Sequence, residues 1–283
     1  VPIHHAHRLI LQRCGNFRQI FRYRRLDSKV TSRSVSTKEK ILGHLIGPLG
    51  LIFEVNTIAA LVEKFFTQQT GAMYGTTNAD MVVTMGERYE VVITVAKILA
   101  VLLGLFNGWL IQHTQSRQGR MRPWYLIFGF VSIVIGCLIF LFPGSTLGES
   151  YWYYFFFLLI AYNTVGSTFF YLFRDTICSL TTRDPVEKAQ VQFIRKMSWT
   201  LISGVIIGML INMVALPLWL EKDINGYPVL MITLSIIAIP LLLLEYFYTR
   251  ERITEDVAQE VGIEQENTIP LGQQMRALLT NKY

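Results

Sequence analysis

Two ionisable side chains interrupt long apolar stretches of the sequence, and they are the residues best placed to do chemistry. Lys97 stands in the run Val91–Gln112, and Glu54 stands in the run Ile41–Phe66. An ionisable group inside a bilayer is costly and is a functional candidate by default. A buried cation can bind an anionic or polyhydroxylated ligand, and a carboxylate can take up a proton or pair with the cation. The alternatives are a lysine that snorkels to the interface and a glutamic acid that stays protonated.

A stripe of amide, hydroxyl and phenol groups follows one side of the run Tyr151–Leu172. Asn163, Ser167 and Tyr171 recur every four residues, which places them on the same face of a helix. Such a stripe suits a ligand that forms many hydrogen bonds and stacks on an aromatic ring, as a sugar does. The alternative is that these groups hold neighbouring helices together.

The elements that must position these residues are membrane-spanning helices. The chain is 52% hydrophobic and 16% charged, with a mean hydropathy of +0.37, whereas soluble domains carry about 25% charged residues. A helix needs about 20 mostly apolar residues to cross a bilayer. Six runs predict an all-α membrane protein with six transmembrane helices: Ile41–Phe66, Val91–Gln112, Trp124–Phe142, Tyr151–Leu172, Ser198–Leu220 and Val229–Tyr248.

The connecting segments alternate in charge and predict the orientation. Segments 1–40, 113–123, 173–196 and 249–283 hold 22 of the 26 Lys and Arg residues, and the segments on the other side hold two. Because Lys and Arg collect on the cytoplasmic side, we expect a multi-pass protein of the cell membrane with both termini cytoplasmic. Its parts are then a basic N-terminal tail (1–40), a six-helix bundle (41–248) and a cytoplasmic linker (249–283).

Several classes of function are not supported by the sequence. The formal charge of +6 lies between apolar runs instead of along one polar face, so no nucleic-acid partner is expected. No nucleophile elbow, phosphate-binding loop, HExxH motif or dinucleotide fingerprint occurs. We therefore predict that the chain is not an enzyme and has no cofactor or metal site. The expected partners are the lipid bilayer and a small polar substrate.

The loop before the third run carries the most specific pattern, S-R-x-G-R-x-R-P at Ser116–Pro123. Gly119 permits a tight reversal of the chain, and Pro123 suits the first turn of the next helix. Three arginines are expected to hold the loop at the cytoplasmic surface and can cap helix C-termini; they are Arg117, Arg120 and Arg122.

This loop resembles the signature loop of the glycoside–pentoside–hexuronide:cation symporter family (melibiose permease-like), a branch of the major facilitator superfamily. Three further regions resemble that family in the same order: Thr37–Gly71, Thr181–Met197, and Thr249–Arg252 followed by Leu279–Lys282. The resemblance implies a fold of two six-helix halves, each made of two inverted three-helix repeats. This chain is then the N-terminal half of a sugar or glycoside transporter. A second bundle would come from the same gene, from another chain or from a second copy.

The resemblance also bears on the site. Lys97 matches a position that is basic in the family, and Arg195 matches an arginine that contacts sugar at the start of the fifth helix. With the residues singled out above, the predicted substrate-binding set is Lys97, Glu54, Asn163, Ser167, Tyr171 and Arg195.

The family's acidic residues are absent from the matching positions. Those that hold the coupling cation fall at Ala100 and Gly104 on the second run and near Tyr171 on the fourth, and an acidic sugar ligand falls at Ile52. The cation-binding residues are therefore left open. The alternative function is a non-transporting membrane scaffold or sensor subunit, or an inactive gene fragment.

Overall fold

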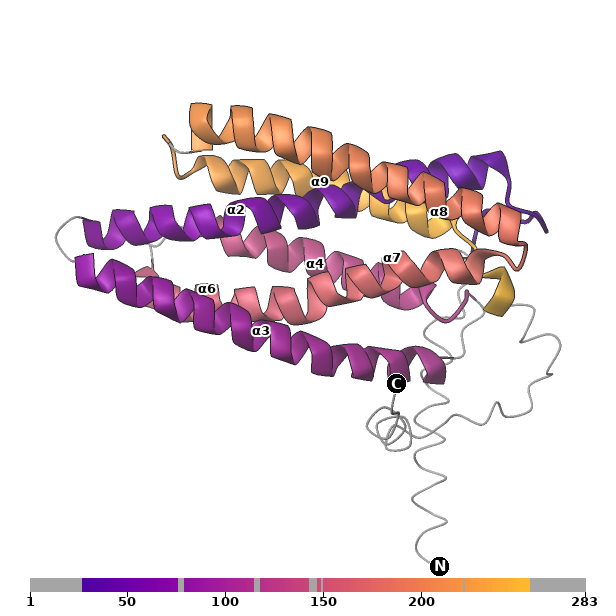
Figure 1. Ribbon diagram of the computed structural model, residues 1–283, viewed down its shortest axis with the longest axis horizontal. Coiled ribbons are helices and arrows are strands. Elements are labelled where there is room, and N and C mark those ends of the chain that lie inside the picture. Colours follow the sequence, from indigo (N-terminus) through magenta and orange to yellow (C-terminus); the bar gives the residue numbers. More distant parts are fainter. Residues whose placement is uncertain are drawn as a thin grey trace, which may run out of the picture.

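The computed structural model describes residues 27–254 apart from 76–78, 115–117, 143–146, 149 and 221. Every element within these ranges is a helix, as the composition predicts. The long helices lie roughly along one axis of the molecule (Figure 1). Most of the predicted tail, Arg117 of the signature loop and residues 255–283 of the predicted linker lie outside the described residues.

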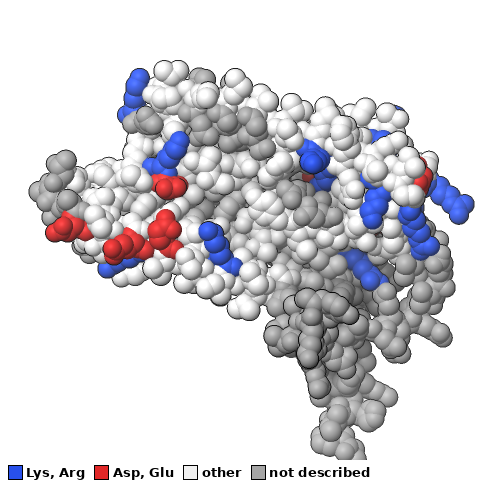
Figure 2. Space-filling model, viewed as in Figure 1, with Lys and Arg blue, Asp and Glu red and all other residues white. Residues whose placement is uncertain are grey.

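Five helical segments of the described chain are long and apolar enough to cross a membrane. The first segment, Glu39–Tyr74, consists of η2 (Glu39–Ile46) and α2 (Leu49–Tyr74). The second is Asp80–Ile111 within α3 (Ala79–His113), and the third is Arg122–Leu141 (α4). The fourth, Ser150–Thr181, consists of α6 (Ser150–Ala161), η4 (Tyr162–Ser167) and α7 (Thr168–Thr181), and the fifth is Gly226–Tyr248 (α9). They coincide with five of the six predicted runs. The protein is therefore a multi-pass membrane protein, and most of the charged residues visible in Figure 2 lie towards the two ends of the bundle.

The remaining predicted run, Ser198–Leu220, is not among these five segments. It corresponds to the end of α8 (Pro185–Thr200) and to η5 (Leu201–Leu220), a π-helix that contains Pro217. Part of the side chains of η5 lie outside the described set. A sixth membrane crossing therefore stays a prediction.

Close contact between the first and last described spans organises the core. Gly47 and Gly50 face α9, where a Cβ on Gly47 would stand 2.7 Å from the Cα of Glu245 and a Cβ on Gly50 would stand 3.0 Å from the Cα of Ala238. Small residues are what allow two helix backbones to approach this closely in a membrane. The same glycine face of the η2–α2 segment thus fixes α9 against the middle of the bundle.

Described residues that precede the first span in the sequence pack against residues at and beyond the end of the last span, at one end of the bundle. The Ser28 hydroxyl donates to the Thr249 carbonyl at 2.9 Å, and the Lys29 amide donates to the Phe247 carbonyl at 2.9 Å. The chain before the first span therefore lies against the chain after the last one. The boundaries at 40 and 248 stay predictions, because this contact continues the packed structure beyond both of them.

Candidate functional site

Lys97 lies on an open face of α3. Its side chain is exposed, and a Cβ placed on Gly104 or Gly108 would meet no described atom within 4 Å. Close packing against another described helix therefore does not explain why small residues share this face. Apolar side chains on the other sides of α3 are exposed as well, so the helix is uncovered over most of its circumference; they are Val91, Val95, Ile98, Leu99, Val101, Leu102 and Phe106.

The predicted hydrogen-bonding stripe lies beside α3, on η4 and α7, both of which pack against that helix. The Asn163 amide donates to the Leu159 carbonyl at 2.8 Å, and the Ser167 hydroxyl donates to the Asn163 carbonyl at 3.2 Å. These bonds stay within one helix, so they do not tie it to a neighbour. The Tyr171 side chain is 40% exposed, and its ring centroid lies 6.2 Å from that of Trp199.

The π-helical turn η4 separates α6 from α7 in the middle of this span. Thr168 Oγ1 donates to the Asn163 carbonyl, five residues earlier, at 2.8 Å. Single π-helical turns inside longer helices are frequent at functional sites. The stripe predicted from the sequence therefore begins at a place where the helix is widened.

Glu54 lies inside the protein, away from this open face. It is fully buried on α2, and neither carboxylate oxygen has a hydrogen-bond partner among the described residues. Because Lys97 is exposed on α3, the structure does not form the Glu54–Lys97 pair that the sequence suggested. Of the predicted substrate-binding residues, Lys97 is thus exposed, whereas Glu54 is buried.

Arg195 belongs to a buried ion pair. Its guanidinium lies 2.5 Å from one oxygen of Glu245, and the Tyr125 hydroxyl donates to the other oxygen. Burial acts to lower the pKa of Arg195, but the Glu245 carboxylate offsets this effect and raises the pKa, so the guanidinium stays charged. His44 Nδ1 lies 3.4 Å from the same guanidinium. These contacts join Arg195 to α9, α4 and η2, and none of them is to the Asn163 stripe.

The backbone of the signature loop has the conformation predicted at Gly119 and Pro123, and the side chain of Arg122 is buried. Gly119 has φ +102°, and Pro123 lies in the first turn of α4, which confirms both predictions. Arg122 is only 1% exposed, and its guanidinium donates to the carbonyls of Gln118 at 3.0 Å and Tyr246 at 2.5 Å. Arg122 thus caps the C-terminal end of α9, as expected for an arginine of this loop, and it does so from a buried position.

Glu251 completes this end of the bundle and was not identified as a key residue from the sequence. Its buried carboxylate accepts the backbone N–H groups of Arg120, Met121 and Arg122 at 2.9, 3.0 and 2.8 Å, at the start of α4. Burial raises the pKa of Glu251, and these N–H donors oppose that shift. The only sequence signal for Glu251 was its place in the Thr249–Arg252 segment. The alternating charges of that segment do not reveal which helix the Glu251 side chain contacts.

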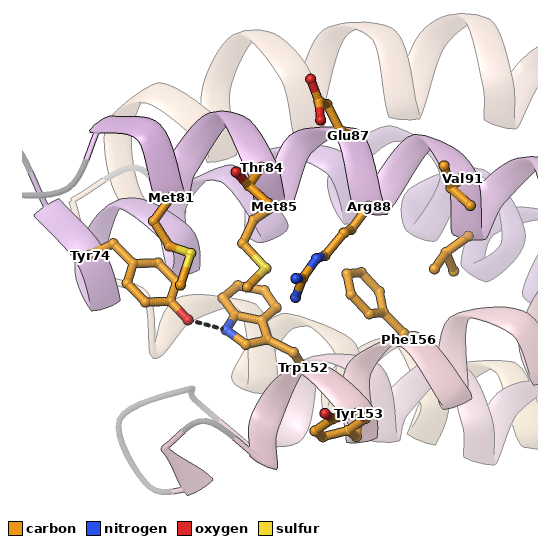
Figure 3. A pocket seen from close by; sticks show the side chains of 11 residues that line it. Tyr74, Met81, Thr84, Met85, Glu87, Arg88, Val91, Trp152, Tyr153 and Phe156 are labelled. Atoms are coloured by element: carbon orange, nitrogen blue, oxygen red, sulfur yellow. Dashed lines mark hydrogen bonds between the residues drawn. The ribbon is translucent and has the colours of Figure 1, made fainter.

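A cavity of about 630 Å³ opens at the opposite end of the bundle, where α2 ends and α3 and α6 begin. Figure 3 shows the Arg88 side chain directed towards Trp152 and Phe156, whereas Glu87 points away. The Trp152 indole donates to the Tyr74 hydroxyl at 2.8 Å. None of the predicted substrate-binding residues lines this cavity.

Comparison with known proteins agrees with the resemblance inferred from the loop. Residues 43–283, which are more than half of the chain, match the family described as MFS/sugar transport protein. The chain is also 25% identical over 194 residues to the isoprimeverose transporter of Lactiplantibacillus pentosus, an alignment that covers 66% of this chain and 37% of that protein. The chain thus spans well under half of the curated relative it matches.

Proposed function

Because the chain belongs to the MFS/sugar transport protein family, we propose that it forms the N-terminal six-helix bundle of a sugar transporter. The substrate binds near the midplane, between this bundle and a second one, and rocking of the two bundles exposes it to each side in turn. In this proposal residues 1–40 and 249–283 are cytoplasmic and the protein works in the cell membrane.

The observation that carries the proposal is the open face around Lys97. A charged side chain well inside a membrane span does not face lipid; it faces a bundle interior or a water-filled cavity. The described chain leaves Lys97 uncovered and leaves space beside Gly104 and Gly108. A second bundle with a polar cavity in front of this face would satisfy the charge, and the exposed Val101 beside Lys97 would pack against that bundle.

Within this cavity we assign substrate contact to Lys97, Asn163, Ser167 and Tyr171. The lysine donates hydrogen bonds to sugar hydroxyls, the stripe adds polar groups, and the phenol ring offers a stacking surface. The Arg195 guanidinium is held by Glu245, so we assign it to positioning α8 instead. Glu54 has no exposed surface and is treated separately below.

Uptake by the reconstituted chain tests this proposal. Lipid vesicles containing the chain together with its second six-helix bundle should take up labelled isoprimeverose or a related glycoside, and light scattering should show two six-helix units in each detergent-solubilised particle. Lys97→Ala should lower uptake about tenfold, the effect of losing one interaction of about 1.4 kcal/mol. Lys97→Arg should retain part of the activity, and Lys222→Ala, which removes an exposed loop lysine, should leave it unchanged.

A non-transporting scaffold or sensor subunit is the second candidate. It is favoured by the absence of carboxylates at Ala100 and Gly104, where the resembling family holds its cation. Stable single-bundle particles that bind lipid or a partner protein and never move sugar would support this function and would contradict transport by the chain itself.

A further inference from the structure

We propose that Glu54 is a proton-binding site and that the proton is the ion coupled to transport. The binding half of this inference concerns one side chain and stands alone, whereas the coupling half rests on the proposed function. The assignment moves ion binding from the second span of the resembling family to the first span of this chain.

The environment of Glu54 is closed and contains polar groups without partners. Its carboxylate is 0% exposed, and both oxygens lack a hydrogen-bond partner in the described protein. The hydroxyl of Thr57, three residues further along α2, is buried and likewise without a hydrogen-bond partner within the described ranges. Buried polar groups are normally hydrogen-bonded, so a buried carboxyl group whose two oxygens both lack a partner indicates a function other than stability.

Two glycines hold these groups close together. A Cβ on Gly136 of α4 would stand 2.9 Å from Glu54 Oε1 and 3.6 Å from Cε2 of the Tyr162 ring. A Cβ on Gly166 would stand 2.9 Å from Ser132 Oγ and 3.3 Å from Cδ2 of the same ring. The carboxyl group, the phenol ring and the serine hydroxyl therefore lie close together between α2, α4 and η4, in packing that leaves no room for a side chain at either glycine.

No cation compensates a negative charge on Glu54 in this region. The titratable groups beside it are the Cys137 thiol on α4 and the Tyr162 phenol on η4. Residues 123–141, 150–167, 201–220 and 226–244 contain no Asp, Glu, Lys or Arg. Arg195 on α8 is paired with Glu245, and Lys97 on α3 is exposed.

These surroundings favour the protonated form. An isolated carboxylate in an apolar interior costs so much that the group takes up a proton instead. A metal cation requires several oxygen ligands around it, and the close packing at Gly136 and Gly166 leaves no room for such a shell, whereas a proton needs one carboxyl oxygen. A conformational change that admits water or a cation to Glu54 would release the proton, and this is the property that a coupling site requires.

Infrared difference spectroscopy of the full chain in lipid vesicles tests the binding half directly. The wild type at neutral pH should show the carbonyl stretch of a protonated, non-hydrogen-bonded carboxyl group, shifted in D₂O and insensitive to added Na⁺. Glu54→Gln should abolish this band. Glu63→Gln, an exposed position on the same helix, should keep it. A band that survives in Glu54→Gln, or that disappears when Na⁺ is added, would overturn the assignment of the proton to Glu54.

Transport by the same vesicles tests the coupling half. With the sugar accepted in the uptake assay, wild-type protein should accumulate it under an inward proton gradient, whereas Glu54→Gln should only equilibrate it. Gradient-driven accumulation by Glu54→Gln would refute coupling through Glu54 while leaving the sugar transporter intact. Absence of uptake by wild-type vesicles that contain both bundles would refute the proposed function, and the infrared band would still decide whether Glu54 binds a proton.

Discussion

Replacing Arg195 with methionine should destabilise the protein strongly, because it leaves the buried Glu245 without its cation. The two side chains are 4% and 0% exposed and lie 2.5 Å apart. Removing one member of a buried ion pair costs about 3–5 kcal/mol. The Tyr125 hydroxyl still donates to Glu245 after the change, so we expect a loss near the lower end, about 3 kcal/mol.

A double-mutant cycle separates the pair from ordinary packing. Replacing a whole buried pair with apolar side chains is often neutral or stabilising, so Arg195→Met combined with Glu245→Leu should cost less than Arg195→Met alone. Equilibrium unfolding in detergent gives each free energy. Lys196→Met, at the exposed neighbouring position of α8, is the control and should change stability by less than about 0.5 kcal/mol.

Simple additivity of the two single changes would refute this reasoning, since a real pair must show a coupling energy. A second result would be equally decisive. If Arg195→Met left the unfolding free energy unchanged and abolished sugar uptake, Arg195 would belong to the substrate site, as the resemblance implied, and the ion pair would not be its role.

Three further changes test other parts of the fold by the same unfolding measurement. Gly47→Leu should cost at least about 1–3 kcal/mol through overpacking against the backbone of α9, whereas Gly71→Leu on the same helix, where a Cβ meets nothing within 4 Å, should cost less; equal losses would contradict the close approach. Gly119→Ala should cost about 1–3 kcal/mol because of its positive φ, and an unchanged protein would argue against the loop conformation. Glu251→Ala removes the acceptor of three backbone N–H groups and should cost at least about 1–3 kcal/mol; retained stability would mean that water replaces the carboxylate.

Helix positions were predictable because they depend on local sequence alone. Long apolar runs, with basic segments at one end of each, located five spans that the structure also contains. The turn at Gly119 and the helix start at Pro123 were predictable for the same reason, since each depends on the conformational preference of one residue. The sixth run, Ser198–Leu220, is as apolar as the others, so composition alone could not distinguish it.

Side-chain partners were not predictable, because they depend on how distant helices meet. Helical spacing put Arg195 next to a predicted span but could not reveal that Glu245, 50 residues later, reaches it. The same limit applies to Arg122, whose buried contact is to a carbonyl 124 residues away. Sequence reasoning therefore singled out Arg195 and Arg122 but not their buried partners, Glu245 and the Tyr246 carbonyl.

In the described part of this protein, some buried ionisable side chains lie beside a partner of opposite charge, whereas Glu54 does not, and this difference indicates which of them serves the function of the protein. At one end of the bundle Arg195 is paired with Glu245, and Arg252 with Glu39 at 2.6 Å, so those ions stabilise an arrangement of helices. Glu54 lies deeper within its span, and its carboxylate has no such partner in the described chain. An isolated buried carboxyl group contributes no ion pair to the stability of the fold, and burying it carries a desolvation cost. The energetic penalty of keeping Glu54 is therefore best explained by a change of its protonation state during the protein's working cycle.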